Sequence, residues 1–258
     1  MITIKKPEEI RILRVGGRIL AEVLGEIVSR VGPGVRTIEL DQIAEGLIIK
    51  KGGVPSFKDY RSQRGEPAFP TTLCTSVNEQ LVHVPASEYK LKVGDILNID
   101  IGMRYPALNG LYTDMAVTVP VGRVSQRARK LIRVTKRSLS LGIEQVRPGK
   151  SIFDISRTIQ SYVESQGFSV IRHLVGHGVG YEVHEEPRIP NFLDKNQPLI
   201  ELKEGMVLAI EPMVSAGDYP IKTLEDQWSV VMADGSLGAH FEHTVVVTRG
   251  GYEVLTTI

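Results

Sequence analysis

Apolar residues recur at helical spacing near the start of the chain. Pro7-Glu8-Glu9 places a proline at a permissive first-turn position and acids at the positive end of the helix dipole. The apolar face that follows consists of Ile10, Leu13, Ile19, Leu20, Val23, Leu24 and Ile27. A second helix is predicted to begin after Thr37 and to end at Gly52-Gly53.

Short apolar runs alternate with further helical patterns along the rest of the chain. We predict strands around residues 72–76, 96–101 and 116–119, helices near 125–146 and 151–166, and strands near 169–175, 206–211 and 242–248. Residues 58–67 are polar and aperiodic, which predicts an exposed loop. Because helices come in pairs before groups of strands, the pattern indicates an α+β fold with a curved, mostly antiparallel sheet flanked by helices.

Two strand-forming stretches repeat each other, and each ends in an acid. KVGDILNID at residues 92–100 aligns with KEGMVLAIE at residues 203–211, so Asp100 lies opposite Glu211. The turns VGPG and VRPG form a second repeat in the same order, each followed by a hydroxyl residue that can cap a helix, Thr37 or Ser151. We therefore predict a single domain over residues 1–258, built from pseudo-two-fold halves of roughly 1–120 and 121–258.

Composition narrows the class of protein. The chain is 42% apolar, long enough for a large core, and its 31 basic and 30 acidic residues nearly cancel. The balance gives no support for binding to nucleic acid or to an anionic membrane. Cys74, the single cysteine, has no partner for an internal disulfide, and the sequence contains neither a signal core nor a membrane-length apolar run. These features predict a soluble cytoplasmic protein.

Five acids and histidines lie in apolar or glycine-rich settings: Asp100, Asp114, His177, Glu211 and Glu242. Buried carboxylates that converge on one point repel one another unless cations neutralise them. Four carboxylates and one imidazole match a centre of two divalent ions about 3.5–4 Å apart. Oxygen-rich ligation with no thiolate suits Co, Mn, Fe or Zn and does not choose among them. The alternative is that these acids only cap strands or form salt bridges.

The order of the motifs resembles one peptidase family. NID at residues 98–100, TD at 113–114, GHGVG at 176–180, HEEP at 184–187, IEPM at 210–213 and EHT at 242–244 together are similar to the type I methionine aminopeptidases, which have the pita-bread fold. The resemblance covers essentially the whole chain. It implies a dinuclear metal hydrolase that removes the N-terminal methionine of nascent polypeptides by attack of a metal-activated water on the first peptide bond.

The resemblance also implies a role for each residue of the centre. Asp114 and Glu242 would bridge both ions, and Asp100 would chelate one of them. His177 and Glu211 would complete the other site, with Glu211 also moving a proton from water to the leaving amine.

Two further histidines and a pocket follow from the same family pattern. His184 would stabilise the developing oxyanion, and His83 would contact the substrate near the scissile nitrogen. The methionine pocket would be lined by Phe69, Cys74, Val183 and Trp228, with His83 and His184 at its edge. His173, His240 and His243 are interpreted as structural. Val84 and Leu174 depart from the residues common in the family, and their effect on the rate is left open.

Two other classes compete with this interpretation. X-Pro aminopeptidases and prolidases share the five ligands, but they usually carry an additional N-terminal domain, whereas this sequence starts its first helix at Pro7. A metal-free peptide-binding protein of the same fold would be expected to have lost ligands. The favoured partners are N-terminal Met peptides and nascent polypeptides, with a transient ribosome contact, and the favoured state is a monomer. The native metal, the preference after methionine and the role of residues 58–67 are left open.

Overall fold

The computed structural model describes residues 1–61, 65 and 67–257, in which two helices precede the strands of each half. The first half contains α1 (Pro7–Ser29), α2 (Thr37–Lys50), β1 (Val54–Pro55), β2 (Leu73–Val77), β3 (Gln80–Val82), β4 (Ile96–Tyr105) and β5 (Leu111–Pro120). The second half contains α3 (Gln126–Ile143), α4 (Ile152–Ser165), β6 (Ser169–Val170), β7 (Val175–Gly178), β8 (Glu185–Pro190), β9 (Val207–Ile210), β10 (Met213–Ser215), β11 (Ile221–Thr223), β12 (Val230–Met232), β13 (Gly238–His240), β14 (Glu242–Thr248) and β15 (Gly251–Val254).

One nine-stranded antiparallel sheet joins the two halves. Its main path runs β1-β4-β5-β14-β9-β7-β8, with β2 paired to β4 and β15 paired to β14. The halves meet where β5 pairs with β14, and the two repeated strands, β4 and β9, lie on either side of that central pair. Two three-stranded sheets, β13-β10-β6 and β11-β12-β3, complete the structure. The predicted α+β architecture with pseudo-two-fold halves is confirmed.

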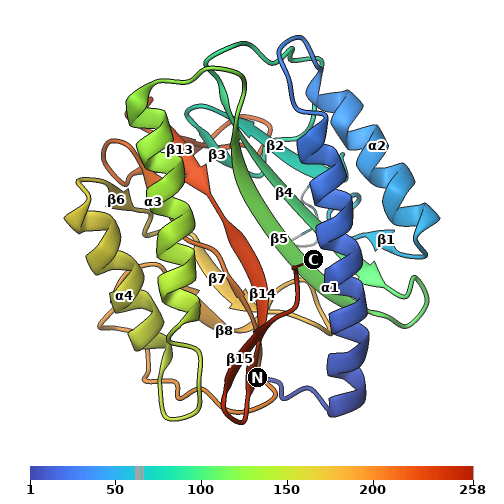
Figure 1. The fold of residues 1–258 in the computed structure, drawn as a ribbon, viewed down its shortest axis with the longest axis vertical. Helices are drawn as coiled ribbons and strands as arrows, with labels where there is room; N and C mark the ends of the chain where they lie inside the picture. The colour runs from blue at the N-terminus through green and yellow to red at the C-terminus, as the bar shows by residue number, and fades with distance from the viewer. Residues whose placement is uncertain (62–64, 66, 258) are drawn as a thin grey trace.

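The helices form where the sequence places caps and apolar faces. In α1 the Glu9 carboxylate accepts a hydrogen bond of 2.7 Å from the Lys6 backbone N–H, and Leu20, Val23 and Ile27 are fully buried. In α3 the Ser125 hydroxyl accepts a hydrogen bond of 3.1 Å from a first-turn N–H. Helices α1 and α2 pack against strands of the first half, and α3 and α4 pack mainly against strands of the second (Figure 1).

Alternation along β4 decides which side chains face the helices. Ile99, Ile101 and Met103 pack in one apolar cluster with residues of α1 and α2. Successive side chains of a strand point to opposite faces, so Asn98 and Asp100 project from the other face of the sheet. The helices therefore cover one face, and the acids of the predicted centre are left on the face that they do not cover.

Some strand boundaries differ from the prediction. β5 begins at Leu111, so Asp114 lies inside the strand rather than at its start. The hairpin with β4 extends the pairing beyond the apolar run, because Arg104 and Tyr112 are register partners despite their polarity. The three-residue strands β3, β10, β11, β12 and β13 were not predicted, since so few residues carry no periodic signal. Of the loop predicted at 58–67, residues 62–64 and 66 lie outside the described residues, and the others are in neither helix nor strand.

None of the described helices is both long enough and apolar enough to span a bilayer.

The contact between α1 and the C-terminal segment predicts a large stability effect at one glycine. A Cβ at Gly17 would lie 2.4 Å from the backbone oxygen of Leu255, and backbone cannot move aside cheaply. We expect Gly17→Ala to lower the free energy of unfolding by about 1–3 kcal/mol, measured by urea denaturation. Gly46→Ala is the matched control, because that exposed helical position is open and alanine favours helix by about 1 kcal/mol. Equal stability of the two variants would contradict the prediction.

Candidate metal centre and active site

Strand register brings the predicted ligands onto one face of the sheet. Asp100 pairs with Ala116 across β4 and β5, and Ala116 pairs with Glu242 across β5 and β14. Asp114 is two residues from Ala116, so it projects from the same face. The three acids thus come from adjacent positions on three neighbouring strands.

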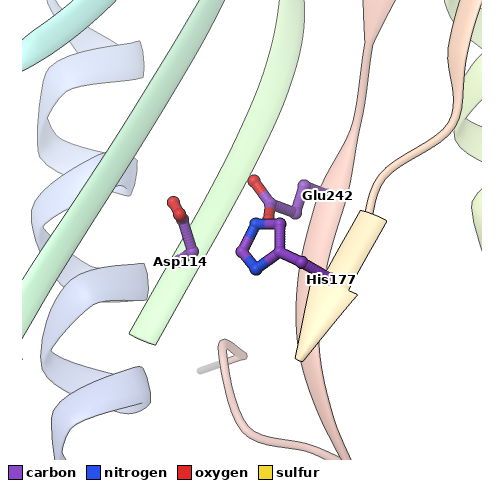
Figure 2. Close-up of side chains that lie close together, drawn as sticks. All are labelled: Asp114, His177 and Glu242. Carbon is purple, nitrogen blue, oxygen red and sulfur yellow. The ribbon is translucent and has the colours of Figure 1, made fainter. Parts of the chain in front are cut away.

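His177 reaches the same face from β7, in the second half. His177 and Thr244 are both register partners of Ala209 on β9, and the Thr244 hydroxyl bonds the backbone of Asp114 through two contacts of 2.8 and 2.9 Å. Asp114, His177 and Glu242 each offer one ligand atom, and these atoms lie within 4.8 Å of one another. Figure 2 shows the three side chains pointing toward one another from β5, β7 and β14.

The carboxylates are buried without the hydrogen bonds that buried charge needs. Asp100, Asp114 and Glu242 are at most 8% exposed, and each has one side-chain oxygen with no hydrogen-bond partner in the described part of the chain. Burial raises the pKa of Asp100 to about 6, and burial together with the neighbouring acids holds the pKa of Asp114 and of Glu242 well above the usual range. Buried carboxylate oxygens without hydrogen-bond partners are suitable ligands for divalent cations, so these three acids can bind a metal ion.

Glu211 lies between two imidazoles. Its Oε1 is 3.6 Å from His177 Nε2, and its Oε2 is 3.2 Å from His240 Nε2, although this second pair is not aligned for a hydrogen bond. Burial raises the pKa of Glu211 to about 8 and lowers the pKa of His177 to about 3. A neutral imidazole beside these acids is ready to act as a nitrogen ligand.

A cavity of about 330 Å³ opens above this cluster. Its walls include all five predicted ligands together with the predicted residues Phe69, Cys74, His83, His184 and Trp228. Phe69 and Trp228 meet edge to face, with ring centroids 5.3 Å apart. Burial and the nearby Asp100 and Asp114 raise the pKa of the Cys74 thiol well above its usual range, so the thiol is a neutral part of the wall.

The two other predicted histidines also reach the cavity. His83 has a φ of 57°, in the left-handed region that is uncommon for residues other than glycine, and burial lowers its pKa to about 4. Backbone held in this region is often found at functional positions. The His184 ring meets the His177 ring edge to face, with centroids 4.6 Å apart; the residue is exposed at the cavity, and partial desolvation by the surrounding side chains lowers its pKa.

Val183 does not fit its predicted place. It is buried, but it is not among the residues that line the cavity. Its neighbour His184 is the residue of this bend that lines the cavity. Of the two departures from the family pattern, Leu174 lines the cavity and Val84 does not.

The cavity also contains residues that sequence reasoning missed: Phe57, Tyr60, Thr223, Gln227 and Val230. They come from loops and short strands with no periodic signal. His240 was interpreted as structural, yet it lies beside Glu211. It precedes Glu242 by two residues in extended backbone, a spacing that could have placed it near the centre. His243 faces the other way, as predicted, and its Nδ1 is 2.9 Å from the Thr256 hydroxyl.

Comparison with known proteins identifies the family. Residues 11–249 match the sequence model of metallopeptidase family M24. The chain belongs to this family. The M24 match spans both halves of the sheet and every residue of the buried Asp114, His177 and Glu242 cluster.

Within family M24 the chain falls among the methionine aminopeptidases. It is 49% identical to methionine aminopeptidase 1 of Bacillus subtilis, over the full length of both chains. The crystal structure of methionine aminopeptidase from Thermotoga maritima has a TM-score of 0.93 and 41% identity, again covering both chains completely. The prolidase from Pyrococcus furiosus has a TM-score of 0.76 and 24% identity, covering 99% of this chain and 65% of that one, a likeness of fold.

Proposed function

We propose that this protein is a methionine aminopeptidase that removes the N-terminal methionine of polypeptides by hydrolysis of the first peptide bond. The observation that carries the proposal is the joint placement of four carboxylates, three of them buried, and His177 in the wall of a cavity that also contains an aromatic pair and a thiol. Chains with N-terminal methionine are the corresponding substrates.

We infer that two divalent ions, of Co, Mn, Fe or Zn, bind at this cluster. Asp114 and Glu242 would be shared by both ions, Asp100 would bind one, and His177 with Glu211 would bind the other. When bound, the ions would lower the pKa of water and polarise the scissile carbonyl. The orphaned oxygens of the buried acids support this assignment, because a cation would satisfy them.

The chain's own residues would supply the proton transfers and the orientation of the substrate. Glu211 would take a proton from water and return it to the leaving nitrogen, because its carboxylate lines the cavity beside the cluster and can act first as a general base and then as a general acid. His184 would donate a hydrogen bond to the carbonyl oxygen as negative charge develops on it. His83 would contact the substrate beside the scissile nitrogen.

The pocket would select methionine by shape and softness. Phe69 and Trp228 form an aromatic wall, and Cys74 adds a thiol. Sulfur close to aromatic rings makes favourable contacts, so an unbranched thioether suits these walls. The volume of about 330 Å³ suits a small side chain together with the first peptide unit.

The experiment that tests the function compares two peptide classes. The purified protein, after removal of bound metal, is supplied in turn with Mn, Fe, Co or Zn and incubated with Met-Ala-Ser and with X-Pro peptides. We expect release of free methionine from Met-Ala-Ser and no release of X from the X-Pro peptides. The reverse result would indicate a prolidase or X-Pro aminopeptidase, and no activity with no metal bound would indicate a peptide-binding protein.

We also infer that residues 1–258 form one catalytic domain, because β5 and β14 join the two halves within a single sheet. The monomeric state, the cytoplasmic location and a transient contact with the ribosome remain predictions.

A further inference from the structure

A tyrosine from the first half of the chain touches the histidine proposed to bind the substrate carbonyl. The Tyr60 hydroxyl oxygen is 2.9 Å from His184 Nδ1, and the two rings meet edge to face with centroids 5.5 Å apart. Tyr60 follows β1, whereas His184 precedes β8, so the contact links segments from opposite halves. Both residues line the same cavity as the metal cluster.

The direction of this hydrogen bond and the tautomer of His184 determine each other. A phenol keeps its proton up to a pH of about 10, whereas imidazole is mostly neutral above about 6.5. At neutral pH both groups are uncharged, so the contact is either Tyr60 O–H donating to His184 Nδ1 or His184 Nδ1–H donating to the Tyr60 oxygen. A neutral imidazole that accepts at Nδ1 carries its single proton on Nε2.

The other contacts of His184 keep the ring in place. Its face is limited by the His177 ring at 4.6 Å. The turn that carries it is tied down by Glu185, whose Oε1 accepts a hydrogen bond of 2.5 Å from the Tyr181 backbone and whose Oε2 pairs with the fully buried Lys5 at 2.6 Å. With the backbone fixed and Nδ1 engaged by Tyr60, Nε2 is the ring nitrogen that His184 can present to a ligand in the cavity.

We propose that Tyr60 is a positioning residue for peptide hydrolysis, whose hydroxyl holds His184 in the Nε2–H tautomer and directs that proton to the substrate carbonyl oxygen. The inference rests on the proposed function and deepens it. It also gives a role to the beginning of the polar loop predicted at residues 58–67, which brings a hydroxyl to the active site.

The first test is Tyr60→Phe, which removes the hydroxyl and retains the ring. We expect kcat for Met-Ala-Ser to fall roughly 10- to 100-fold, by analogy with the loss of a group that orients a metal-binding imidazole. KM and metal content should stay within about twofold, because oxyanion stabilisation acts mainly in the transition state. Tyr181→Phe is the matched control, since that hydroxyl belongs to the same turn but donates to Glu9 Oε2 at 2.8 Å. Equal kcat values for the two variants would overturn the proposal.

The second test separates positioning from an independent role. In a His184→Ala background Tyr60→Phe should cause no further loss of kcat, whereas two multiplying losses would show that Tyr60 acts without His184. Nitrogen-15 NMR of the histidine-labelled protein should show a protonated Nε2 at His184, and its signals are identified by their loss in His184→Ala. A protonated Nδ1 at His184 would overturn the role proposed for Tyr60, whatever the activity of the protein. Failure of the wild-type protein to release methionine would refute the proposed function and would leave the tautomer measurement unaffected.

Discussion

Replacing Asp114 with asparagine is expected to lower kcat for methionine release by roughly a thousand-fold. Asp114 is proposed to be shared by both ions, and an amide supplies neither the negative charge nor the second strong donor oxygen. Metal ions contribute several kcal/mol of transition-state stabilisation, and each 1.36 kcal/mol corresponds to a factor of ten. Glu242→Gln should have a similar effect, because its carboxylate lies on the neighbouring strand and projects into the same cluster.

The fall in kcat should result from weaker metal binding and not from unfolding of the variant. Burial and the adjacent acids hold the pKa of Asp114 well above its usual range, so an uncharged isostere relieves repulsion in the metal-free protein. We therefore expect the thermal midpoint of metal-free Asp114→Asn to equal or exceed that of metal-free wild type, while its bound metal falls. The exposed Asp218 supplies the control variant Asp218→Asn. Near-normal kcat in Asp114→Asn would mean that the centre is assigned to the wrong residues.

The metal-free protein should lose stability as the pH rises from 7 to 8.5. Burial raises the pKa of Glu211 to about 8, and the pKa values of Asp114 and Glu242 are raised well above normal. Acids with raised pKa bind protons more tightly in the folded state than in the unfolded state, so their stabilising effect is present at low pH and is lost as the pH rises through the folded pKa. The buried histidines have lowered pKa values and add stability as the pH rises, but most of that gain is complete by pH 7, because an unfolded histidine titrates near about 6.5.

Excess Mn²⁺ should counteract this loss of stability at high pH. A ligand of the folded state at one hundred times its Kd adds about 2.7 kcal/mol to the free energy of unfolding, and metal competes better with protons at higher pH. We expect the increase in thermal midpoint on adding Mn²⁺ to be larger at pH 8.5 than at pH 7, measured by differential scanning calorimetry. Glu211→Gln should weaken the pH dependence of the metal-free protein, whereas Glu253→Gln, a surface change at the pair with Arg14, should retain it. A metal-free midpoint that is constant over this range would contradict the proposed charge cluster.

Much of the fold could be read from local patterns. Five of the seven residues predicted for the apolar face of α1 are buried and Ile10 and Ile19 are half-buried, because burial of one helix face imposes a regular spacing. The repeated sequences predicted two equivalent strands that each end in an acid. Strands β4 and β9 do flank the central pair of the sheet, but Asp100 lies inside β4 and Glu211 directly follows β9. The short strands β10 to β13 and the true start of β5 escaped prediction, because their pairing depends on partners distant in the sequence.

By itself the sequence determined the candidate ligands. An acid in an apolar run is costly to bury without a partner, so Asp100, Asp114 and Glu242 were identifiable from local context alone. Only the tertiary structure decided which other groups meet them: that His240 lies beside Glu211, that Tyr60 reaches His184, and that Val183 does not line the cavity. The physical reason is that burial preference is a property of each residue and its neighbours in the chain, whereas contact between distant segments is set by strand register and loop path.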